Sequence, residues 1–255
     1  MSGGGLTLMA DRDARPLVSV AVPLRAQVAA IARFAARPTF APAPMPWGRA
    51  SAAALAVVFA FDVVTGVLVY AVTGVLDQGG VFLPEPLEFE TTWAQDLVEF
   101  LIIAPLLEEL AFRGWLTGRI AALRFALHGF AAMGLFVAAL YVPYDYATPV
   151  ALAGVAAVFA GLIQWGRTRH RDTAVPAWFA RHFHWIVWGS SLVFGLIHLG
   201  NYEPLTHPFG VLVVLPQTIG GLLLAYTRTR LGLGAAIAHH AAFNAVFLAT
   251  DYGWW

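Results

Sequence analysis

The sequence predicts an all-α fold: a polytopic transmembrane helical bundle of about seven spans, with a candidate N-terminal interfacial helix. The first observation is composition, because 59% of the 255 residues are hydrophobic and only 12% are charged, whereas soluble domains are usually about 25% charged. The second is a set of long runs without Asp, Glu or Arg, over residues 126–144, 146–166 and 204–227. Since about 20 apolar residues cross a hydrocarbon layer of about 30 Å, these runs predict membrane-spanning helices.

The N-terminal region, residues 1–48, is expected to precede the spans. Residues 1–16 are typical of a flexible tail and lack the apolar stretch of a cleaved signal peptide. Residues 23–37 have a helical pattern whose apolar face contains Leu24, Val28, Ile31 and Ala35. Such a helix either lies in the membrane interface or packs as a short soluble helix on the bundle, and both alternatives stay open. Residues 38–47 contain four prolines and predict a linker.

Residues 49–255 are expected to form one transmembrane domain, since no internal repeat divides them. The predicted spans cover residues 50–76, 96–118, 125–144, 147–166, 184–202, 209–227 and 233–250. With a cytoplasmic N-terminus, the inner segments and connections then hold Arg25, Arg33, Arg37, Arg49, Arg119, Arg124, Arg167, Arg169, Arg171, Arg181, Arg228 and Arg230. The outer connections hold no arginine, and their acids are Asp77, Glu85, Glu88, Glu90, Asp145, Glu203 and Asp251. This follows the positive-inside rule and predicts a multi-pass protein of the plasma membrane with an external C-terminus.

Ionisable and polar side chains inside the spans are the candidates for chemistry, because such groups are costly in hydrocarbon. They are Glu108, Glu109, Arg113, His198, His240 and Asn244, with Asp62 as an isolated further acid. Glu109 and Arg113 are four residues apart on one helix, in the favoured order for an ion pair. Glu108 points about 100° away from Glu109. One carboxylate is therefore paired, and the other is free to serve as a general base.

The two candidate histidines lie at similar depths. His240 and Asn244 are four residues apart and share a helix face, whereas His239 lies about 100° away and is interpreted as a bystander. Counted from the inner helix ends, Glu108, His198 and His240 lie roughly 16, 21 and 15 Å deep at about 1.5 Å per residue. All three are therefore expected near the middle of the membrane, where they could meet.

The motifs around these residues occur in a recognisable order. EELAFR fits EExxxR, FGLIH fits FxxxH and HAAFN fits HxxxN. Together they resemble the CAAX protease and bacteriocin-processing (CPBP, or Abi) family of intramembrane peptidases, over about residues 92–250. The resemblance implies that Glu108 activates water with help from His198, that Glu109 pairs with Arg113, and that His240 and Asn244 stabilise the oxyanion. The expected activity is hydrolysis of a peptide bond in a peptide or protein substrate near or in the lipid bilayer.

Other chemistries fit less well. The chain has no cysteine, which excludes disulfides, thiolate nucleophiles and Cys-ligated metals, and its zero net charge gives no attraction to nucleic acid. No cofactor is expected, although Glu108, His198 and His240 could form a zinc site with an open position. The alternative functions are a non-proteolytic scaffold or immunity factor of the same fold, and a proton-coupled transporter. The lack of repeated halves argues against the transporter.

Overall fold

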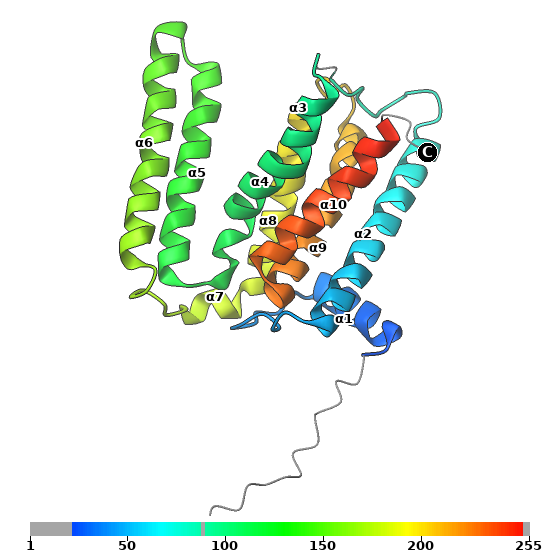
Figure 1. The fold of residues 1–255 in the computed structure, drawn as a ribbon. Helices are drawn as coiled ribbons and strands as arrows, with labels where there is room; N and C mark the ends of the chain where they lie inside the picture. Colours follow the sequence, from blue (N-terminus) through cyan, green and yellow to red (C-terminus); the bar gives the residue numbers. More distant parts are fainter. Residues whose placement is uncertain (1–21, 88–89, 252–255) are drawn as a thin grey trace, which may run out of the picture.

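The computed structural model describes residues 22–87 and 90–251, and Figure 1 shows that they are almost entirely helical. The only β pairing in these residues is an isolated bridge between Pro86 and Tyr202. The elements in chain order are α1 (Leu24–Ala36), α2 (Arg49–Leu76), α3 (Trp93–Val98), the π turn η1 (Glu99–Ile103), α4 (Ala104–Phe112), η2 (Gly114–Thr117), α5 (Ile120–Tyr141), α6 (Tyr144–Thr168), α7 (Ala177–Arg181), α8 (Phe183–Ile197), η3 (His198–Asn201), η4 (Pro208–Val214), α9 (Leu215–Leu231) and α10 (Leu233–Asp251). The predicted all-α bundle is confirmed.

Six helical segments of the described chain are long and apolar enough to cross a membrane. They correspond to six of the seven predicted spans. The remaining one, predicted over residues 96–118, is built from α3, η1, α4 and η2 in succession. Pro105 explains the interruption, because it has no amide hydrogen to donate to the carbonyl of Leu101, and the backbone shifts into a π turn just before it. Figure 1 shows α3 and α4 running beside α10, so this segment belongs to the bundle.

The packing core lies around α9, with one buried cluster against α8 and another against α1 and α2. Helix α9 contacts α2, α8 and α10, and it contains the largest group of buried residues in the structure's helices. Helices α5 and α6 form a hairpin on one side, apart from the other helices (Figure 1). Phe130 of this hairpin meets the rings of Phe112 and Trp115 edge-on.

Helix α1 contacts α2 and α9 of the bundle, and its place in the membrane interface stays a prediction. Ile31 and Phe34 are buried, with Ile31 against Val58 and Leu223. Leu24 is 64% exposed, and with Val28 it lines a shallow apolar hollow against α2. The proline-rich linker is also held in place, since Arg230 donates to the Thr39 hydroxyl at 2.7 Å.

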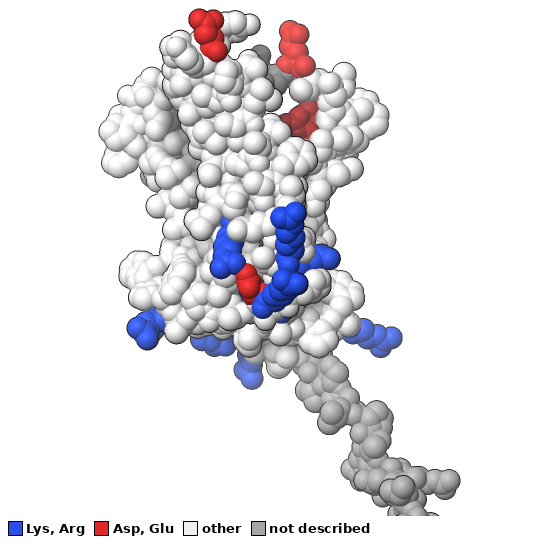
Figure 2. All heavy atoms as spheres, turned by 90° about the vertical axis from the view of Figure 1, so that its left-hand side faces the viewer, with Lys and Arg blue, Asp and Glu red and all other residues white. Residues whose placement is uncertain are grey.

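The charges separate along the bundle. Figure 2 shows arginines gathered toward the lower end, acids mainly toward the upper end, and a broad uncharged band between them. This band matches the part of the helices expected in hydrocarbon. One acid does lie among the arginines, where Asp172 pairs with Arg124. The arginine-rich end is thus one face of the molecule, and its cytoplasmic location stays a prediction.

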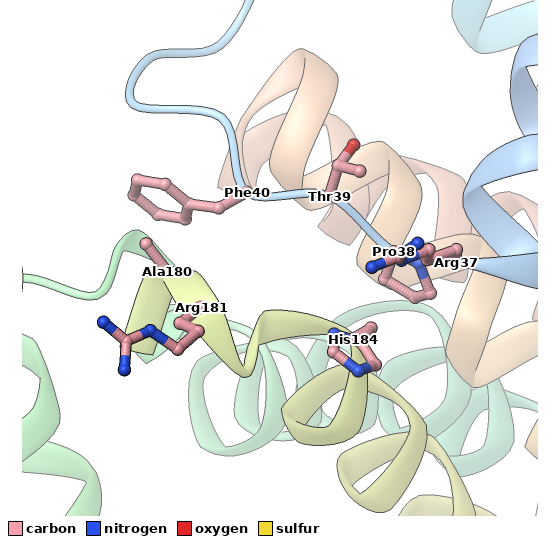
Figure 3. A pocket seen from close by; sticks show the side chains of 7 residues that line it. All are labelled: Arg37, Pro38, Thr39, Phe40, Ala180, Arg181 and His184. Atoms are coloured by element: carbon pink, nitrogen blue, oxygen red, sulfur yellow. The ribbon is translucent and has the colours of Figure 1, made fainter. Parts of the chain in front are cut away.

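A hollow of about 350 Å³ lies at this arginine-rich end. Figure 3 shows its lining between the linker and the α7–α8 corner: Arg37, Pro38, Thr39, Phe40, Ala180, Arg181 and His184. The ring of Phe40 meets those of Phe179 and Phe183, which fixes this wall. The lining contains none of the candidate catalytic residues, so the hollow and the glutamates are separate features.

The arginine distribution generates a prediction about topology. Reporter fusions at residues 80 and 175 should lie on opposite sides of the membrane, external and cytoplasmic respectively, because three spans separate them. Alkaline phosphatase and green fluorescent protein fusions would report the two sides. Finding both positions on one side would contradict the seven-span arrangement.

Candidate active site

The centre of the site is a buried ion pair on α4 and the turn after it. Glu109 is 0% exposed and Arg113 is 1% exposed. Arg113 Nη1 lies 3.0 Å from Glu109 Oε1, and Nη2 donates to the Gly221 carbonyl at 3.1 Å. The guanidinium also lies 3.9 Å from the centre of the Phe194 ring, a cation–π contact. One charged group therefore connects α4 to both α8 and α9.

Two glycines make room for this arrangement. A Cβ atom on Gly221 would lie 3.0 Å from both Arg113 Nη2 and the Phe194 ring. A Cβ on Gly195 would lie 1.9 Å from the Thr218 hydroxyl, so α8 and α9 could not approach as closely with any larger residue there. Both glycines sit in the segments that flank the second and third motifs, SSLVFG and PQTIGGLLLAY.

Glu108, the second carboxylate, points to the two histidines. Its Oε2 lies 4.0 Å from His198 Nε2 and 3.8 Å from His240 Nε2. This oxygen is buried and has no hydrogen-bond partner among the described residues. The structure thus brings Glu108, His198 and His240 together from three helical segments. Adjacent positions on α4 separate the two acids: one is paired with Arg113, and the other faces imidazoles.

The other ring nitrogens fix both histidines. His198 Nδ1 lies 2.7 Å from the Phe194 carbonyl, and His240 Nδ1 lies 3.1 Å from Glu109 Oε1. Each partner accepts hydrogen bonds, so each Nδ1 carries the proton. In the neutral rings, both Nε2 lone pairs therefore face the Glu108 carboxylate. A water molecule in this space could donate its two hydrogens to two of these three acceptors.

Asn244 is placed by the π turn. Its Nδ2 donates to the Phe100 carbonyl at 2.8 Å. That carbonyl lacks its usual helical donor, because the amide of Ala104 donates to Glu99 instead and Pro105 has no amide hydrogen. The side-chain amide carries two hydrogens, so one remains for a ligand. The sequence placed Asn244 beside His240, but it gave no sign of this backbone acceptor.

Residues 170–246 match the model of the type II CAAX prenyl endopeptidase Rce1-like family. The match confirms the resemblance to the CAAX protease family. It covers α7 to most of α10 and includes His198, His240 and Asn244, whereas Glu108, Glu109 and Arg113 precede it. No curated protein and no solved structure matches the chain. At the family level, the match supports a CAAX protease-type intramembrane peptidase in a multi-pass membrane protein.

The candidate site has a neighbour that the sequence analysis missed. His239, interpreted as a bystander, is 1% exposed and lies 3.2 Å from Asp62 Oδ2 through its Nε2. Its Nδ1 lies 2.9 Å from the Thr227 hydroxyl. Asp62, which the sequence left isolated, therefore has a partner. Depth could have suggested the pair, because Asp62 and His239 lie roughly 20 and 14 Å from Arg49 and Arg230 at about 1.5 Å per residue.

The fit of a metal to this site can be judged from the donor atoms. Glu108, His198 and His240 would supply a carboxylate and two imidazoles, which are suitable zinc ligands. Ligands about 2.0–2.2 Å from a tetrahedral zinc are roughly 3.3–3.6 Å apart, whereas the carboxylate–imidazole separations here are 3.8 and 4.0 Å. Within the described residues, no group of three His, Cys, Asp or Glu has the arrangement of a metal site. The three side chains could therefore hold a zinc ion or share a water molecule, and the metal-free alternative stays a prediction.

The Glu109–Arg113 pair generates a stability prediction. Glu109→Gln leaves a buried guanidinium without its counter-ion, which should lower the free energy of unfolding by about 3–5 kcal/mol. Thermal unfolding of purified protein in detergent would measure the change. The matched control is Glu99→Gln, because Glu99 is an exposed glutamate of η1. An unfolding temperature equal to wild type in Glu109→Gln would contradict the role of the pair.

The π turn generates a second prediction. Pro105→Ala restores a backbone donor, so η1 can return to α-helical hydrogen bonding and the Phe100 carbonyl no longer needs Asn244. We expect stability to hold or rise, because proline inside a helix costs about 3 kcal/mol. Peptidase kcat should fall about ten- to a hundredfold, as misplacement by about 1 Å can cause. The control Pro149→Ala removes a proline inside α6 and should leave kcat unchanged. Equal kcat in both variants would show that the π turn at Pro105 does not influence the site.

Proposed function

We propose that this chain is an intramembrane endopeptidase of the CAAX protease type that uses a water molecule activated by Glu108 and His198. The observation that carries the proposal is that His198 Nε2 and His240 Nε2 both lie within 4.0 Å of the Glu108 carboxylate. A general base needs to reach its water at about 2.6–3.2 Å, and a water between these groups satisfies that requirement.

The reaction begins with proton transfer to Glu108. The water oxygen attacks the peptide carbonyl carbon while its proton passes to the Glu108 carboxylate, and His198 orients the water. The carbonyl oxygen becomes an oxyanion, stabilised by the free amide hydrogen of Asn244 and by His240, which must carry a second proton, on Nε2, to donate there. Glu108 then returns the proton to the departing nitrogen as the carbon–nitrogen bond breaks. Preorganised donors of this kind supply about 10²–10³ in rate per donor.

Glu109 and Arg113 hold this site without taking part in the proton transfers. Glu109 Oε1 accepts hydrogen bonds from both Arg113 Nη1 and His240 Nδ1, at 3.0 and 3.1 Å. The same oxygen thus fixes the ring that faces the oxyanion. Glu109 is already engaged by Arg113 and His240, which leaves Glu108 as the carboxylate that can reach a water molecule.

The surroundings favour a substrate presented from the bilayer. Leu106 and Leu107, which precede Glu108 on α4, are 43% and 60% exposed. An apolar surface therefore borders the carboxylate on its own helix. A peptide or protein segment near or in the membrane suits this approach, with the lipid bilayer as the other partner, and a location in the plasma membrane with a cytoplasmic N-terminus is part of the proposal.

Replacing Glu108 tests the function. Glu108→Gln is isosteric but cannot accept the proton, so cleavage should fall by at least a thousandfold while unfolding temperature and membrane insertion stay at wild-type values. The probe is a fluorogenic CAAX-type peptide in proteoliposomes, in farnesylated and unprenylated forms, with Glu99→Gln as control. Near-normal cleavage by Glu108→Gln would remove Glu108 from the mechanism. A cellular phenotype retained without Glu108 would favour the non-proteolytic scaffold.

The metal-free mechanism has its own prediction. Activity should survive exhaustive chelation, and metal analysis of purified protein should find much less than one zinc per chain. Stoichiometric zinc, with activity lost on removal and restored on addition, would overturn the metal-free mechanism. That result would recast Glu108, His198 and His240 as ligands of a catalytic zinc.

A further inference from the structure

A second buried polar cluster lies beside the proposed site. It consists of Asp62 on α2, Thr227 on α9 and His239 on α10, which are 2%, 0% and 1% exposed. His239 Nδ1 is 2.9 Å from the Thr227 hydroxyl, and His239 Nε2 is 3.2 Å from Asp62 Oδ2. The second contact is close, although it is not aligned as a hydrogen bond. Both ring nitrogens therefore meet polar groups from two other helices.

The neighbours of the cluster restrict it further. The ring of Phe59 meets that of His239 edge-on, with centres 5.9 Å apart. The Asp62 carboxylate lies over Gly220, where an added Cβ would be 3.7 Å from Oδ1. The next residue, Gly221, accepts the hydrogen bond from Arg113. The cluster thus lies against the same turn of α9 that binds Arg113 of the buried ion pair.

Packing alone does not account for these residues. Replacing a buried ion pair by apolar side chains is often neutral or stabilising, and ionisable groups are costly inside a membrane. Three apolar residues would join α2, α9 and α10 at lower cost. What the polar cluster adds is direction, because a hydroxyl bound to Nδ1 and a carboxylate close to Nε2 favour one orientation of the imidazole.

The fixed orientation of His239 affects His240, which is the next residue of α10. His239 is bound by Thr227 and lies beside Asp62, whereas His240 is bound by Glu109. The two side chains point in directions about 100° apart around the helix. Two such fixed points determine both the rotation and the axial position of α10. We propose that Asp62, Thr227 and His239 form a positioning cluster that aims His240 at Glu108. This inference rests on the proposed peptidase function and makes α2, which the family match does not cover, part of the catalytic unit.

The most direct test replaces the polar side chains of the cluster by apolar ones that still fill the space between the helices. In the double variant Asp62→Val/His239→Leu, the unfolding temperature should stay close to wild type, while kcat falls at least tenfold and KM stays within twofold. KM is spared because the cluster does not touch substrate. The control is Thr73→Val, since Thr73 is a buried α2 residue whose hydroxyl bonds only to the carbonyls of its own helix. A stable double variant with wild-type kcat would show a merely structural role and overturn the proposal.

A second measurement needs no substrate. Because the chain has no cysteine, the pair Phe100→Cys/Asn244→Cys can report how η1 faces α10. Oxidative crosslinking should be at least fivefold slower with Asp62→Val/His239→Leu added and unchanged with Thr73→Val added. Equal rates in both backgrounds would overturn the positioning role. If wild-type protein cleaves no peptide, the proposed function fails, and the crosslinking rates alone decide whether the cluster positions α10.

Discussion

The buried contact between Arg113 and Glu109 is the constraint on which the rest of the site depends. A guanidinium in a membrane-embedded core needs a counter-ion and hydrogen-bond acceptors. Glu109 and the carbonyl of Gly221 supply them. The backbone carbonyl of Arg113 in turn accepts a hydrogen bond from Arg228 Nε at 2.9 Å. Helices α4 and α9 are thereby joined at two points, and the close approach requires the small residue at 221.

This constraint explains why two adjacent acids can have different environments. The helix turns about 100° per residue. The Glu109 side chain therefore points into the core, while that of Glu108 points into the space between α4, α8 and α10. Glu109 satisfies Arg113 and also anchors His240. Glu108 keeps an oxygen without a hydrogen-bond partner among the described residues. A buried polar atom of this kind is costly in a fold and is expected where chemistry takes place.

The irregular backbone of η1 helps to position the same site. The π turn before Pro105 leaves the Phe100 carbonyl for Asn244, which ties the start of the α4 segment to α10. On the other side of α10, Asp62 and Thr227 contact His239. Helix α10 is therefore held by polar contacts on both sides of the histidine pair, whereas the α5–α6 hairpin meets the bundle mainly through aromatic rings.

The sequence by itself determined the helical class, the approximate spans and the set of buried ionisable residues. Hydropathy and the free-energy cost of a charge in hydrocarbon can both be read from local composition. The sequence also supported the Glu109–Arg113 pair, since both residues lie on one helix face. It could not show that Asp62 reaches His239, nor that Asn244 finds a carbonyl on η1. These contacts join residues more than a hundred positions apart. They depend on how each helix is rotated and packed against its neighbours, which only the tertiary structure decides.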